Sequence, residues 1–170
     1  IQYLTVKNLT TSGTIDFSGC DTVDEQAREI IHKRSDVSVG DILFASIAPL
    51  GRCYLIQNPP EKWDINESVF SIRRNAFRVT SEFLYMYFMS DTFIKAATSS
   101  STGSIFKGIR INTLLDIAAV IPPKDIVTAF TTQVKTLLAL KEQKGTENRE
   151  LTKLRDWLLP VLMNGQATVE

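Results

Sequence analysis

The side chains that most often hold metal ions or act as nucleophiles are few in this sequence. It contains two cysteines, Cys20 and Cys53, and one histidine, His32. They do not have the paired Cys and His spacing of a zinc site, and two cysteines cannot form a disulfide framework. We therefore expect no metal centre. For His32 we expect a simpler role, a positive charge that favours the C-terminal end of a short helix.

Two short motifs in the first half of the chain are similar to catalytic motifs but lack residues that catalysis needs. Asn58-Pro59-Pro60-Glu61 invites comparison with the Asn-Pro-Pro-aromatic motif of amino-methyltransferases, whose aromatic ring stacks on a flipped base. The fourth residue here is Glu61, and no glycine-rich nucleotide loop follows a predicted strand, so the motif predicts a turn. A nuclease needs clustered carboxylates, and Glu61-Lys62 supplies only one. The sequence thus predicts no catalytic residue, and without a phosphate-loop motif it also predicts no ATP-driven motor.

Basic side chains at predicted turns and strand ends are the remaining candidates for chemistry. Arginine carries a planar fork of donors that fits guanine edges and phosphates, and lysine supplies a point charge. A polar loop at residues 98–104 could add hydroxyl and backbone N–H donors for phosphates. Each residue could equally be a solvated surface side chain. The candidate nucleic-acid contacts are Lys7, Arg52, Arg73, Arg74, Ser104, Lys107 and Arg110.

Composition and charge limit the classes of protein. Of the 170 residues 44% are hydrophobic and 22% charged, which suits one or two small domains with a core. The 19 basic and 19 acidic side chains balance, and the two signs are also equal in number within residues 1–110 and within residues 111–170. This balance argues against a protein that coats nucleic acid by bulk charge. The sequence has neither a membrane-spanning apolar run nor a signal-peptide pattern, so we expect a cytoplasmic protein.

Residues 1 to about 122 predict a mixed α+β domain. Extended patterns occur at residues 3–7, 42–46, 52–56, 69–73 and 117–121, with turns rich in Gly, Pro, Ser and Thr between them. The spacing of Thr22 and Glu25 fits a capping box and predicts a short helix to about Lys33. Ser81 is placed to cap a second helix that ends near Ala97, with an aromatic face on which the sheet can rest.

The rest of the chain, residues 123–170, predicts a long helical arm. No proline occurs between Pro123 and Pro160, so the segment is either one helix or two that separate near Gly145. Apolar residues recur at the alternating three- and four-residue steps of a coiled coil. Such a helix needs a partner helix, so we predict a homodimer. The predicted interface residues are Val127, Phe130, Val134, Leu137, Leu151, Leu154 and Leu158.

Three stretches of the sequence, taken together, resemble one protein family. They are Gly40–Ile47 (GDILFASI), Thr102–Ile109 (TGSIFKGI) and Leu154–Gly165 (LRDWLLPVLMNG). In composition, order and spacing they are similar to the specificity subunits of type I restriction-modification systems. The resemblance covers essentially the whole chain, and the third stretch is its most specific part.

This resemblance implies a target-recognition domain at residues 1–122, which reads part of a bipartite site in double-stranded DNA. The helix at residues 123–170 would set the spacing and dock methyltransferase subunits. Full-length members carry two such units. This chain carries one and begins at Ile1 within the domain, so we expect a fragment or a natural half-subunit whose second copy completes a palindromic reader. S-adenosylmethionine, ATP and magnesium are expected on the methyltransferase and restriction subunits, and neither a cofactor nor catalysis is expected here.

Two other functions stay open at this stage. A coiled-coil assembly adaptor, whose head binds protein rather than DNA, fits the zero net charge. A recognition domain fused to a methyltransferase requires that Ile1 is not the natural start. Because phosphate contacts release counterions, a steep dependence of duplex affinity on salt would separate DNA recognition from the adaptor.

Overall fold

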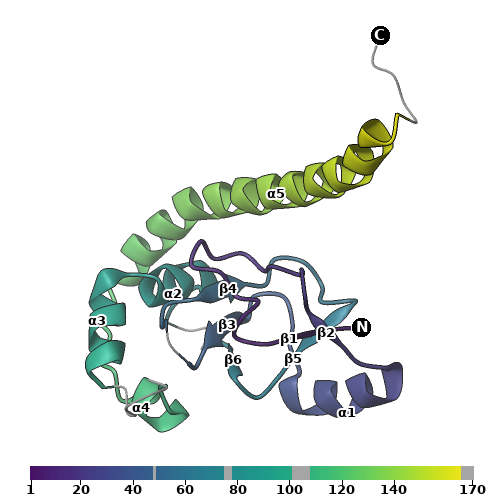
Figure 1. The fold of residues 1–170 in the computed structure, drawn as a ribbon. Helices are drawn as coiled ribbons and strands as arrows, with labels where there is room; N and C mark the ends of the chain where they lie inside the picture. Colours follow the sequence, from purple (N-terminus) through teal and green to yellow (C-terminus); the bar gives the residue numbers. More distant parts are fainter. Residues whose placement is uncertain (48, 75–77, 101–107, 166–170) are drawn as a thin grey trace. The chain divides into compact units, whose positions relative to one another are not determined.

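The computed structural model describes residues 1–47, 49–74, 78–100 and 108–165 (Figure 1). The fold is α+β, with small sheets and short helices followed by a long C-terminal helix, which confirms the predicted class. Its elements in chain order are β1 (Gln2–Leu4), β2 (Asp21–Thr22), α1 (Glu25–Ser35), β3 (Ile42–Ala45), β4 (Cys53–Leu55), β5 (Trp63–Ile65), β6 (Val69–Ile72), α2 (Ser81–Phe88), α3 (Asp91–Ser99), α4 (Ile111–Leu115) and α5 (Lys124–Met163).

Two three-stranded sheets share one core. Their strand orders are β2-β1-β5 and β4-β3-β6. β1 runs antiparallel to β2 and parallel to β5, and β3 runs antiparallel to both of its neighbours. Leu4 and Ile65 of the first sheet lie in the same buried cluster as Leu43 and Tyr54 of the second. All four residues of β3 are buried, so this strand is fixed on both faces and along both edges.

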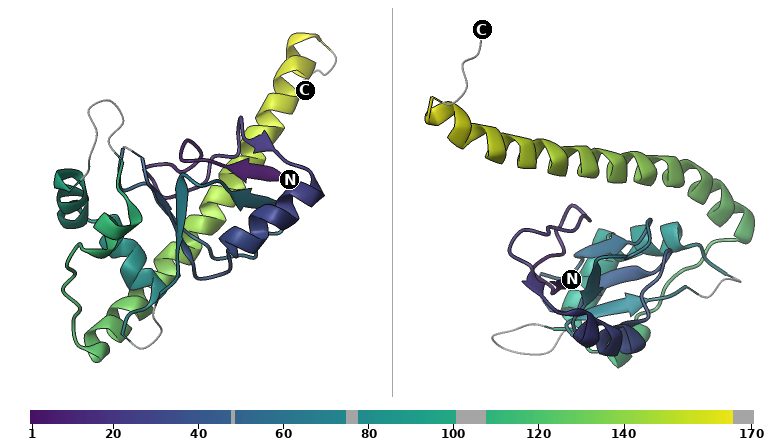
Figure 2. Two further views of the ribbon diagram at one scale, coloured as in Figure 1. Left: turned by 90° about the horizontal axis from the view of Figure 1, so that it is seen from below. Right: turned by 90° about the vertical axis from the view of Figure 1, so that its right-hand side faces the viewer.

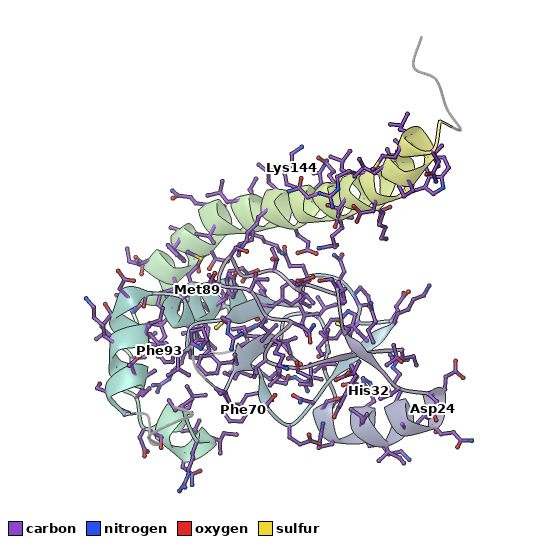
Figure 3. All side chains as sticks on the ribbon, in the orientation of Figure 1. Asp24, His32, Phe70, Met89, Phe93 and Lys144 are labelled. Atoms are coloured by element: carbon purple, nitrogen blue, oxygen red, sulfur yellow. The ribbon has the colours of Figure 1, made fainter. Side chains whose placement is uncertain are left out.

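An aromatic cluster attaches the second and third helices to β3. Phe44 of β3 lies 5.7 Å from Phe88 of α2 and 5.9 Å from Phe93 of α3, measured between ring centroids. Phe88 and Phe93 are 4.9 Å apart and meet edge to face, a favoured arrangement for aromatic rings. Phe93, labelled in Figure 3, is only 1% exposed. The position of α3 relative to the central strand is therefore well determined by packing.

A buried carboxylate ties α1 to β5. Asp64 is fully buried and accepts a hydrogen bond of 2.6 Å from Ser35 Oγ. His32 Nδ1, on the last turn of the same helix, lies 3.0 Å from the other Asp64 oxygen. These partners offset the cost of burying a carboxylate. His32 does lie at the helix end as predicted, but its hydrogen bond to Asp64 was not foreseen.

Of the five predicted strands, three are confirmed, one is confirmed in part and one is wrong. The pattern at residues 3–7 overlaps β1, which ends at Leu4. The patterns at residues 42–46, 52–56 and 69–73 correspond to β3, β4 and β6. The pattern at residues 117–121 does not form a strand; Val120 there is 90% exposed, so the alternation does not correspond to a buried sheet face. The short strand β5 was not predicted, because three residues after a double proline carry too little periodicity.

The cap of α1 differs from the predicted one. Asp24 occupies the N-cap position, and its carboxylate accepts a hydrogen bond of 2.7 Å from the Ala27 backbone N–H. Thr22 instead ends β2, paired with Gln2 of β1. Both side chains can cap a helix. Asp24 caps the helix because Thr22 is held in the strand pair with β1. The local sequence pattern does not show this strand pairing.

The single helix predicted from Ser81 to Ala97 is two helices. Thr80, rather than Ser81, caps α2 and accepts a hydrogen bond of 3.2 Å from the Phe83 backbone N–H. Ser90 caps α3 in the same way. A serine inside a helical pattern can bind the backbone and begin a new helix, and here it lets the chain turn between the aromatic faces of α2 and α3.

One continuous helix, α5, runs from Lys124 to Met163, so the segment is not divided near Gly145 (Figure 2). The described chain forms two compact units, Ile1–Val134 and a second that begins at Lys135. The first turns of α5 pack within the first unit. The Phe130 ring lies 5.9 Å from that of Phe83, and Thr131 Oγ1 is hydrogen-bonded to Thr80 Oγ1 at 2.7 Å.

Candidate nucleic-acid interface

The antiparallel register of β3 places some of the predicted DNA-contact residues near its first residue and others near its last. Ile42 pairs with Ile72, so Arg73 and Arg74 leave the sheet beside the start of β3. At the other end, the Ala45 backbone N–H donates to Arg52 O at 3.0 Å. Asp41 and Ile47 flank β3 and are six residue steps apart, which corresponds to roughly 20 Å of extended chain. The arginines at positions 52 and 73 therefore belong to different surfaces.

The guanidinium of Arg73 is hydrogen-bonded to other residues of the same domain. Its Nε and Nη2 donate to the two Asp41 carboxylate oxygens, each at 2.8 Å. Its guanidinium also donates to the Asp36 carboxylate at 3.1 Å, the Asp36 carbonyl at 2.6 Å and Ser38 Oγ at 3.0 Å. Two-point pairing with a carboxylate is the strongest geometry for arginine. Arg73 thus holds the turn between α1 and β3 in place, a structural role that occupies most of its N–H donors. Its contact with DNA stays a prediction.

The pKa values of this pair follow from the same contacts. Burial by itself raises the pKa of Asp41, but hydrogen bonds from Arg73 and the Ser38 backbone lower it further than burial raises it, so its pKa lies below the ordinary value. The hydrogen bond to Asp41 raises the pKa of Arg73. Both groups are charged at neutral pH, and the Asp41 side chain is only 2% exposed.

We predict that Arg73→Ala destabilises the fold by about 1–3 kcal/mol, because it leaves the buried Asp41 carboxylate without its cation. Exposure of the Arg73 side chain, at 55%, keeps the cost in this range rather than higher. Arg74→Ala is the matched control, since Arg74 is an exposed neighbour of the same type. Urea unfolding of both variants measures the difference. Equal midpoints would contradict the structural role of Arg73.

The chain returns to the end of β3 after α3. Gly108 forms an antiparallel bridge with Ile47, and the Ile109 backbone N–H donates to Ser46 O at 2.8 Å. Arg110, the next residue, is exposed. These contacts place the segment Gly108–Arg110 beside the residues that follow β3.

Arg52 lies at this same end of the strand. Its Nε donates to Pro49 O at 3.1 Å and its Nη2 to Ile47 O at 3.3 Å. Partial burial lowers the pKa of Arg52, yet a guanidinium keeps its charge in proteins. Arg52 and Arg110 are thus linked through Ile47 and Gly108. We call the surface formed by Ile47, Arg52, Gly108 and Arg110, together with the buried Ser46 beneath it, the β3-end surface.

The other predicted contacts are scattered. Lys7 is exposed after β1, in the other sheet, and its backbone N–H donates to Thr5 Oγ1 at 3.3 Å. Arg74 is exposed at the start of β3. Ser104 and Lys107 lie outside the described residues.

The predicted dimer residues differ in exposure. Val127 is 3% exposed and Phe130 36%, both within the first unit, and Val134 is partly exposed. Farther along α5, Leu137, Leu151 and Leu154 are exposed, and Leu158 is partly exposed. Trp157, absent from the predicted interface, is 65% exposed. The apolar surface of α5 is thus concentrated at Leu137 and beyond.

Two further observations concern other classes of site. Within the described ranges, no three His, Cys, Asp or Glu side chains converge as a metal ion would require. None of the helices in the described part of the chain combines the length and the apolar character needed to cross a bilayer.

Comparison with known proteins gives one informative similarity. No family model matches the chain. Over 86 residues, 50% of this chain, the sequence is 30% identical to the type I restriction enzyme HindI specificity subunit of Haemophilus influenzae. The match spans 19% of the length of that relative. This chain is therefore similar, over half of its length, to part of a specificity subunit.

Proposed function

We propose that this chain recognises DNA as a specificity subunit, or part of one, of a type I restriction-modification enzyme. The observation that carries the proposal is the 30% identity to a protein of that name. The β3-end surface supports it, because a fork-shaped cation at Arg52 and an exposed one at Arg110 suit phosphates and guanine edges. Lys7 and Arg74 remain candidate contacts outside this surface.

The chain in this proposal catalyses nothing itself. Methyltransferase and restriction subunits would bind S-adenosylmethionine, ATP and magnesium, and this chain would position them on a bipartite duplex target in the cytoplasm. The arm would pair with a second copy, and the two domains would then read half-sites related by a two-fold axis. Exposed Leu151, Leu154 and Trp157 on α5 supply the apolar surface for that contact.

An adaptor that binds only proteins is the second candidate. The exposed apolar side chains of α5 and the zero net charge favour it. Affinity for duplex DNA and its dependence on salt distinguish the two, because an adaptor has no phosphate contacts to lose.

We predict that the full chain binds duplexes selected from a randomised pool, with an affinity that falls steeply as salt rises. Fluorescence anisotropy over a salt series measures the log–log slope, which is about −0.9 per phosphate contact. Arg110→Gln should weaken binding and reduce the slope by about one. Lys33→Gln, on the exposed surface of α1, is the control with the same loss of charge. No duplex binding at low salt would reject DNA recognition in favour of the adaptor.

We predict that replacing Leu154 and Leu158 by lysine converts a dimer into monomers, because two charges in an apolar helix interface are not solvated. Light scattering after size-exclusion chromatography measures the mass. Ile30→Lys, which changes an exposed apolar residue of α1, is the control and should remain dimeric. A monomeric unaltered chain, or a dimeric double variant, would show that this part of α5 does not form the interface.

A further inference from the structure

A glycine immediately before Arg52 lies where a side chain has no room. Gly51 is buried and has a φ of +88°, in the left-handed region that favours glycine. A Cβ atom at this position would lie 2.7 Å from Cδ1 and 2.9 Å from Cγ1 of Ile94 in α3. Carbon atoms at optimal separation are about 3.5–4.0 Å apart, so the turn approaches α3 as closely as a bare backbone allows.

The backbone of α3 at Ile94 cannot easily move away from this contact, so only a turn of the Ile94 side chain or a shift of the Gly51 turn can relieve it. Its neighbour Phe93 is 1% exposed and packs edge to face on Phe44 and Phe88. A shift of α3 would break this cluster, since buried aromatic rings are closely packed. A side chain at Gly51 would therefore displace the turn or force Ile94 into another rotamer, and it would not displace the helix.

The other side of the β3-end surface is also closely packed, though less so than the contact at Gly51. A Cβ atom on Gly108 would lie 3.2 Å from Ser46 O, the same oxygen that accepts the Ile109 backbone N–H at 2.8 Å. The residues after β3 are thus bounded by α3 at Gly51 and by the segment at Gly108. Any displacement of the turn changes the position of Arg52 relative to Arg110.

We infer that Gly51 is a positioning residue for DNA recognition, whose missing side chain sets the turn of Arg52 against α3 and aligns Arg52 with Arg110. This inference rests on the proposed function. Gly51 itself does not contact DNA. Its effect is carried by the backbone into Arg52, whose guanidinium is held by Ile47 O and Pro49 O.

The test compares Gly51→Ala with Gly40→Ala in the full chain, using duplexes selected from a randomised pool by the unaltered chain. Gly40 has a φ of +91°, so the two alanines suffer the same backbone strain. At Gly40, however, the nearest atom to an added Cβ is Ser81 Oγ at 3.5 Å, an ordinary contact. The pair therefore separates crowding against Ile94 from strain alone. Urea unfolding of each variant shows whether stability changes to the same extent.

Gly51→Ala should weaken duplex binding about tenfold or more and reduce the salt slope, as expected for a lost arginine contact. Gly40→Ala should change the affinity by less than about twofold, within the range of a surface change that leaves contacts intact. Shortening the opposing side chain, in Gly51→Ala with Ile94→Ala, should restore most of the affinity, because the crowding is removed.

A second variant changes the contact between Gly51 and Ile94 from the side of α3. Ile94→Phe keeps Gly51 and should weaken binding in the same way, which preserves the test if Gly51→Ala does not fold. Provided that the unaltered chain binds DNA, two results would overturn the inference. One is an equal loss of affinity in Gly51→Ala and Gly40→Ala. The other is a Gly51→Ala or Ile94→Phe variant that folds and keeps the affinity and salt slope of the unaltered chain. Failure of the unaltered chain to bind any duplex would overturn the proposed function and this inference with it.

Discussion

The central strand β3 is the constraint on which the rest of the first unit depends. Its four residues are fully buried and are hydrogen-bonded to β4 on one edge and β6 on the other. Phe44 anchors α2 and α3 to it, and Leu43 joins it to the core shared with the first sheet. A strand held on all sides has little freedom to shift its register. The segments that follow and precede β3 therefore begin at fixed positions, at opposite ends of the strand.

These two ends use their charges differently. At the start of β3, Arg73 neutralises the buried Asp41 and fixes the turn after α1. At the other end, Arg52 donates to carbonyl groups, which carry no net charge, and Arg110 is exposed. An arginine paired with a buried carboxylate contributes to folding, whereas one bound to carbonyls keeps its positive field. A chain of zero net charge can thus present a positive surface locally.

Patterns that arise from neighbours in sequence were predictable. The three- and four-residue steps predicted α5, and alternating or continuous apolar runs predicted β3, β4 and β6. Choices that depend on distant partners were not. Asp24 caps α1 because Thr22 pairs with β1, and the apolar residues at 117–121 form no strand. The types of the site residues were visible in the sequence, but the sequestration of Arg73 by Asp36 and Asp41 depends on tertiary contacts.

Hydrogen–deuterium exchange of the full chain, with and without a selected duplex, tests most directly whether the β3-end surface is the DNA interface. Bound duplex slows the opening and exchange of the amides that it covers. Our account predicts slower exchange around Ser46 to Arg52 and Gly108 to Arg110, with unchanged exchange in α1 and at Arg73. Protection confined to α1 and the start of β3, with none at the β3-end surface, would contradict it.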